Sequence, residues 1–122
     1  MTTTPTTTLE QAESQGVRLV RLSGSLTQKG VNDVGPAFTA AVRGGGPVVV
    51  DLSGVDVIAT TGITMLLVAD RELKQAGGRM VVAGTRGTVR DVLFRCRLDK
   101  VLSLAPSADD GVELLRRPLA RV

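Results

Sequence analysis

Two adjacent hydroxyl side chains, Thr60 and Thr61, stand directly before Gly62, where a strand-like apolar pattern changes to a helical one. A threonine at a helix start often accepts a hydrogen bond from a free backbone N–H, so an ordinary helix cap is one interpretation. Phosphorylation is the other, because a phosphate there would lie beside the positive end of the helix dipole. Such a modification would alter the surface charge while the fold tolerates it, as a partner-release switch requires.

The sequence offers little other chemistry. Its 122 residues include no His, Trp or Tyr and one Cys, Cys96. Without His, no Ser-His-Asp or Cys-His catalytic set can form, and the dispersed Asp residues do not have the pattern of a metal site. The glycine-rich segments lack the spacings of dinucleotide-binding and P-loop motifs. We therefore expect no enzyme activity, no metal and no cofactor.

Charge and composition restrict the partners. The net charge is +3, the basic residues are scattered, and Phe38 and Phe94 are the only aromatic side chains, so we expect no direct nucleic-acid binding. No apolar run is long enough to insert into a membrane. The lone cysteine and the polar start of the chain, which is unlike a signal peptide, indicate a cytoplasmic protein. Cys96 itself is predicted to be a small core residue on a helical stripe.

Apolar periodicity predicts alternating strands and helices. A strand within residues 6–13 should pair with a strand over 17–23 through a turn at Gln15-Gly16, and Gly24 should close the second strand. The next helix carries a stripe from Val31 to Val42 and either begins at Pro36 or is kinked there. Further elements are predicted as a strand over 48–52, a helix over 62–76 with its first two turns buried, a strand over 80–83, a short helix after Gly87, a strand over 101–104, and a helix after Ser107 that Pro118 ends or bends.

This alternation predicts an α/β fold, with a mixed, largely parallel sheet of about four to five strands flanked by about four helices. One domain should span residues 6–117, with a flexible lead of residues 1–5 and a tail of residues 118–122. Binding sites in such folds gather beyond the carboxyl ends of the strands. Three predicted loops meet that description, at residues 24–30, 54–62 and 84–88.

The segments DLSGV-x4-TTG-x2-MLL, GGRMVVAG and VRDVLFRCRLDKVLSL, in this order, resemble the STAS domain of anti-sigma-factor antagonists over residues 17–117. The resemblance implies a STAS fold and a partner-switching role. The unmodified protein would bind an anti-sigma factor that is also a serine/threonine kinase, that kinase would phosphorylate it at the start of the second helix, and a phosphatase would reset it. The implied acceptor is Thr61, the hydroxyl residue before the glycine, with Thr60 as the alternative. The implied partner-binding residues are Gly24, Ser25, Thr27, Thr60, Thr61, Gly62, Ile63, Thr85 and Arg86.

The chain departs from the family pattern at two acidic positions. Ala59 stands where the family usually has Asp, and Thr27 stands where an acidic residue usually follows the first strand. A second hypothesis is therefore a STAS interaction module without a switch, docking on an ABC-transporter ATPase or a stressosome-like scaffold. A third is a nucleotide- or lipid-binding domain whose ligand lies over the helix start, supported by Arg86 and the loop amides.

Overall fold

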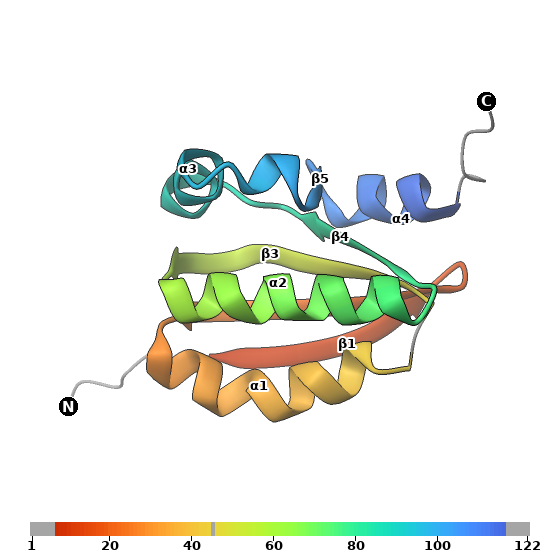
Figure 1. Cartoon of the computed structure of the whole chain (residues 1–122), viewed down its shortest axis with the longest axis horizontal. Coiled ribbons are helices and arrows are strands. Elements are labelled where there is room, and N and C mark those ends of the chain that lie inside the picture. Colours follow the sequence, from red (N-terminus) through yellow and green to blue (C-terminus); the bar gives the residue numbers. More distant parts are fainter. Residues whose placement is uncertain (1–6, 45, 117–122) are drawn as a thin grey trace.

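The computed structural model describes residues 7–44 and 46–116; the predicted lead of residues 1–5, the tail of residues 118–122 and the helix end at Pro118 lie outside the described residues. Strands and helices alternate along the chain, and one sheet contains the strands in the order β1-β2-β3-β4-β5 (Figure 1). β1 is antiparallel to β2, and the other neighbours are parallel. The elements are β1 (Thr8–Ser14), β2 (Val17–Leu26), α1 (Gln28–Val42), β3 (Pro47–Ile58), α2 (Thr60–Gln75), β4 (Arg79–Ala83), α3 (Gly87–Arg95), a 3₁₀ turn (Leu98–Lys100), β5 (Ser103–Ala105) and α4 (Ala108–Arg116).

The predicted α/β fold is therefore confirmed, as is the amino-terminal hairpin. Ser14 pairs with Val17, so the connection contains only Gln15 and Gly16. Both have positive φ, 54° and 83°, which is typical of a two-residue type I′ turn.

The two faces of the sheet carry different helices. Successive strand residues point to opposite faces, so Val48, Val50 and Leu52 pack in one core cluster while Val49 packs in the other. The first cluster includes buried residues of α1, α2 and α3, and the second includes Val112 of α4. This explains why β3 begins as an uninterrupted apolar run: both of its faces are covered.

The structure corrects two of the three predicted loops. β2 continues past Gly24 to Leu26 and β3 continues to Ile58, so segments 24–30 and 54–62 are mostly strand end and helix start. Irregularities in the register, between Arg21 and Ser23 and again at Gly24, let the strands stay paired through polar residues. Only Thr27 and Ala59 then lie between strand and helix.

α1 rules out one of the two predicted alternatives, a helix that begins at Pro36. It begins at Gln28, not at Pro36, because Thr27 caps it by accepting a hydrogen bond from the Gly30 N–H at 3.3 Å. The helix continues through Pro36. Gly35, which precedes that proline, has no Cβ to crowd the proline ring.

Burial differs from the prediction at Cys96 and in α2. Cys96 is exposed because α3 ends at Arg95, so the core side of α3 is formed by Val89 and Leu93. In the first turns of α2 only Gly62, Leu66 and Ala69 are fully buried, and Val68 is 48% exposed. The apolar surface of these turns is larger than the sheet and the neighbouring helices cover.

Candidate functional site

The candidate site lies where β2 and β3 end and α1 and α2 begin. Leu26 and Ile58 form the last pair between these strands, and the Ala59 N–H donates to the Leu26 carbonyl at 2.9 Å. Each helix starts within two residues of this pair. The predicted residues Gly24–Thr27 and Thr60–Ile63 are therefore brought together at one end of the sheet.

Two glycines allow the helices to begin so close to the strands. A Cβ on Gly62 would lie 2.9 Å from both the Leu26 carbonyl oxygen and Ile58 Cγ1. A Cβ on Gly30 would overlap the Ser25 carbonyl oxygen. Neither position leaves room for a side chain, so the geometry of the site depends on both glycines.

An acidic residue that the sequence pattern did not indicate as part of the site lies beside this end of the sheet. The Ser25 hydroxyl donates to Asp56 Oδ1 at 3.1 Å, and both side chains are in an exposed contact. The Ser25 carbonyl in turn accepts a hydrogen bond from the Thr7 hydroxyl at 2.8 Å. Asp56 was overlooked because segment 54–62 was predicted to be a loop; a strand pairing Ser25 with Val57 would have placed it here.

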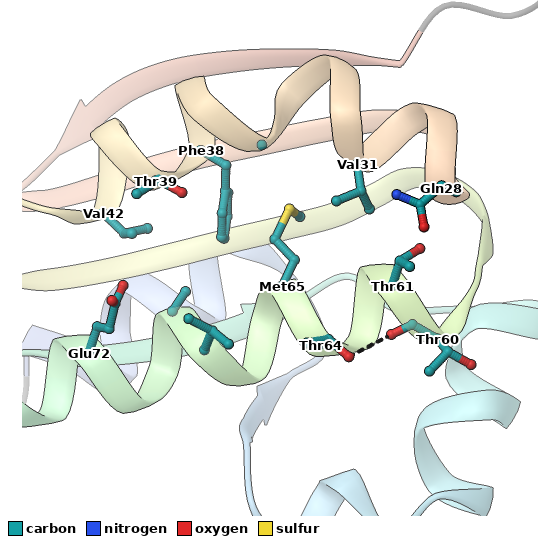
Figure 2. Close-up of a pocket in the computed structure, with 13 residues that line it drawn as sticks. Gln28, Val31, Phe38, Thr39, Val42, Thr60, Thr61, Thr64, Met65 and Glu72 are labelled. Atoms are coloured by element: carbon teal, nitrogen blue, oxygen red, sulfur yellow. Dashed lines mark hydrogen bonds between the residues drawn. The ribbon is translucent and has the colours of Figure 1, made fainter.

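The two threonines of the motif have different environments (Figure 2). Thr60 is exposed, and its carbonyl accepts from the Thr64 hydroxyl at 3.0 Å. Thr61 points from α2 toward α1; its Oγ1 is buried and has no hydrogen-bond partner among the described residues. No side chain caps α2, whose N-cap residue is Ala59. The interpretation of this pair as an ordinary helix cap is therefore wrong.

We expect Thr61→Val to raise the free energy of unfolding by about 1 kcal/mol, because valine has the same shape and removes a buried hydroxyl without a partner. Urea denaturation of both proteins measures the difference. Thr64→Val is the matched control on the same helix: it removes a hydroxyl that is exposed and hydrogen-bonded, so it should leave stability unchanged or slightly lower. A Thr61→Val protein less stable than wild type would show that the hydroxyl has a stabilising partner.

The predicted residues Thr85 and Arg86 are joined to this end of the sheet through β3. Arg86 Nη2 donates to the Ser53 carbonyl at 2.9 Å. The Ser53 N–H donates to Asp51 Oδ1 at 2.9 Å, and Asp51 Oδ2 lies 3.0 Å from Arg21 Nε. This chain of contacts positions the exposed Arg86 and the half-buried Thr85 at the start of α3. No direct hydrogen bond joins them to the two threonines within the described ranges.

A groove with a volume of about 410 Å³ separates α1 from α2 and was not foreseen from the sequence. One end is polar, with Gln28, Thr60, Thr61 and Thr64, and the middle is mainly apolar (Figure 2). The other lining residues are Val31, Gly35, Phe38, Thr39, Val42, Met65, Val68, Ala69 and Glu72. Thr61 thus belongs both to the Thr60-Thr61-Gly62 motif and to the wall of a groove.

No group of three or more His, Cys, Asp or Glu side chains within 7–44 and 46–116 is arranged to hold a metal ion. Across these ranges, no helix combines the length and the apolar character needed to cross a bilayer.

The sequence agrees with a known domain over most of its length. The sequence profile of the STAS domain matches residues 8–111. The chain belongs to the STAS domain family. Solved structures similar to this chain include an anti-sigma factor antagonist from Mycobacterium paratuberculosis, with 27% sequence identity and a TM-score of 0.82. The match covers 92% of this chain and 96% of the mycobacterial chain.

Two more distant structures share the fold. A putative anti-sigma factor antagonist from Thermotoga maritima is 15% identical, with a TM-score of 0.82 and coverage of 89% of this chain and 95% of its own. The Bacillus cell fate determinant SpoIIAA in its phosphorylated form is 18% identical, with a TM-score of 0.65 and coverage of 89% and 100%. Among curated proteins, none matches the chain significantly.

Proposed function

We propose that this STAS domain is an anti-sigma-factor antagonist. It binds an anti-sigma factor that is also a serine/threonine kinase, and phosphorylation of Thr61 at the start of α2 releases it. The observation that carries the proposal is the placement of Thr60-Thr61-Gly62 at the end of the sheet, beside Gly24–Thr27. The likeness to the mycobacterial antagonist, at 27% identity over nearly the full length of both chains, supports the same role.

Thr61 is an acceptor that must turn outward before a kinase can reach it. Its oxygen is buried, but it has no hydrogen bond in the described structure, so rotation about χ1 breaks none. Thr60 is already exposed and is the alternative acceptor. Phosphorylation at Thr61 therefore requires a local side-chain movement, which binding of the kinase partner can supply.

The start of α2 is suited to the phosphorylated state. It has no acidic residue in its first turn and no side-chain cap, so its free N–H groups and positive dipole end are available to a phosphate. A phosphate would add about −1.5 to −2 charges to this edge of the sheet. A partner fitted to the neutral surface would lose affinity, and a phosphatase would restore it.

Capture from the lysate of the source organism tests the proposal, with wild type, Thr61→Ala and Thr61→Glu as baits and mass spectrometry of the bound proteins. An anti-sigma factor with a kinase domain should bind wild type and Thr61→Ala, and bind Thr61→Glu at least tenfold more weakly. Thr64→Glu, which adds the same charge one turn later on α2, is the control and should bind nearly as well as wild type. Phosphopeptide mapping of native protein should locate the phosphate at residue 61 or 60.

A STAS module without a switch is the second candidate. The buried Thr61 oxygen favours it, together with Ala59 and Thr27 in place of acidic residues. Its partner would be a transporter ATPase or a stressosome-like scaffold. Equal capture of such a partner by all baits, with no phosphate at residues 60 and 61, would replace the antagonist proposal by this one.

A further inference from the structure

We propose that the groove between α1 and α2 binds a single-chain carboxylate amphiphile. The hydrocarbon tail lies along the apolar middle of the groove, and the carboxylate lies at the end where both helices begin. This inference does not depend on the proposed partner or on phosphorylation.

The middle of the groove is suited to a hydrocarbon chain. It is lined from α1 by Val31, Phe38 and Val42, and from α2 by Met65 and Val68 (Figure 2). Its volume of about 410 Å³ is in the range of small-molecule sites, which are mostly apolar with few polar groups. Val68 is 48% exposed without a ligand, so a bound tail would remove apolar surface from water.

The polar end of the groove is suited to an anion. α1 and α2 run side by side in the same direction, so their amino-terminal ends lie at this same end (Figure 1). Neither helix has an acidic residue in its first turn, and no side chain caps α2. Two positive helix ends therefore face the same place, which favours a negatively charged group.

Thr61 supplies the second, independent observation at this end. The residue lines the groove, and its Oγ1 is buried and has no hydrogen-bond partner among the described residues, so rotation about χ1 can turn the hydroxyl toward a ligand in the groove without breaking a hydrogen bond. A hydroxyl can donate to a carboxylate, and a hydrogen bond to a charged group is stronger than one between neutral groups. A carboxylate head would therefore satisfy the one buried side-chain polar atom of the described residues that the protein leaves unsatisfied.

The opposite end of the groove sets the orientation and the length of the ligand. Glu72 lies there and would repel a carboxylate, so the head belongs at Thr61 and the tail extends toward Glu72. At the rise of an α-helix, Thr61 and Glu72 are about 16 Å apart, a few ångströms more than the length of an extended chain of ten to twelve carbons, so the tail ends before Glu72.

Calorimetric titration of the purified full chain with octanoate and decanoate, below their micelle concentrations, tests the proposal. Decanoate should bind, and each added methylene should tighten binding by roughly fourfold. Thr61→Val should weaken decanoate binding by about tenfold. Val68→Asp should weaken it by a larger factor, whereas Val101→Asp, at a residue that is 53% exposed and outside the groove lining, should leave it unchanged.

Three outcomes would overturn the proposal: no binding of decanoate, equal weakening by Val68→Asp and Val101→Asp, or 1-decanol binding as tightly as decanoate. The last would show that the helix ends do not select a carboxylate. Because these titrations contain no partner protein, their failure leaves the antagonist proposal standing. Equally, a failed capture experiment would leave the groove proposal intact.

Discussion

Replacing Gly30 by alanine is expected to lower the free energy of unfolding by about 3 kcal/mol or more, at the upper end of the cost of overpacking. The new Cβ would overlap the Ser25 carbonyl oxygen and lie 2.7 Å from the Thr7 hydroxyl. Neither atom can move freely, because Ser25 is part of the β2–β3 ladder and its carbonyl accepts from Thr7. The first turn of α1 would have to shift away from the sheet.

Gly35→Ala on the same helix is the matched control for this substitution. A Cβ there meets no atom of another element within 4 Å. Alanine has a higher helix propensity than glycine, but its Cβ crowds the following Pro36. These two effects oppose one another and are each about 1 kcal/mol or less, so we expect little net change in the free energy of unfolding. Urea denaturation of the three proteins measures both effects. Equal stabilities for Gly30→Ala and wild type would show that α1 does not need its close approach to β2.

The parts of the fold that follow from local rules could be predicted from the sequence. Gln15-Gly16 between two β-rich segments indicates a two-residue turn, and the structure has it. The apolar run beginning at Val48 indicates a strand covered on both faces, and its faces do belong to two core clusters. Both signals lie within a few residues of the feature that they predict.

The errors arose where long-range packing decides the structure. β2 and β3 extend through Ser25 and Asp56 because each strand supplies pairing for the other, which no local pattern shows. Pro36 left two alternatives open, a helix start or a helix kinked at the proline, and the cap at Thr27 together with the sheet beneath selects a helix that begins at Gln28 and runs through Pro36. Cys96 fits an apolar stripe by spacing, but α3 ends before it.

The candidate site was predicted in position better than in environment. The motif before Gly62 does begin a helix at the end of the sheet, as its spacing indicated. The burial of the Thr61 oxygen depends on how closely α1 packs beside α2, and the groove between them depends on the same distance. Neither can be deduced from periodicity, which describes one helix at a time.

Arg21 and Asp51 form an ion pair next to the Arg86 contact. We expect removal of Arg21, the more exposed partner, to lower the free energy of unfolding more than removal of Asp51. The Asp51 side chain is 4% exposed and that of Arg21 is 48% exposed. Arg21→Ala leaves a buried carboxylate whose remaining described partner is the Ser53 N–H. We expect Arg21→Ala to lower the free energy of unfolding by about 2–3 kcal/mol. This is below the usual range for a broken buried ion pair, because removal of the Arg21 side chain also lets water reach the carboxylate.

Asp51→Ala should lower the free energy of unfolding by less, about 1–2 kcal/mol. The Arg21 side chain can then extend into solvent, and the main loss is the hydrogen-bond acceptor of the Ser53 N–H. Once Asp51 is absent, Arg21 has no buried charge to balance, so the double variant should be about as stable as Asp51→Ala alone. Urea denaturation of all four proteins gives a coupling energy, expected to be about 2–3 kcal/mol, the cost of Arg21→Ala when Asp51 is present. Additive effects would show that the pair is only a surface contact, and that packing of the 84–86 loop depends on other contacts.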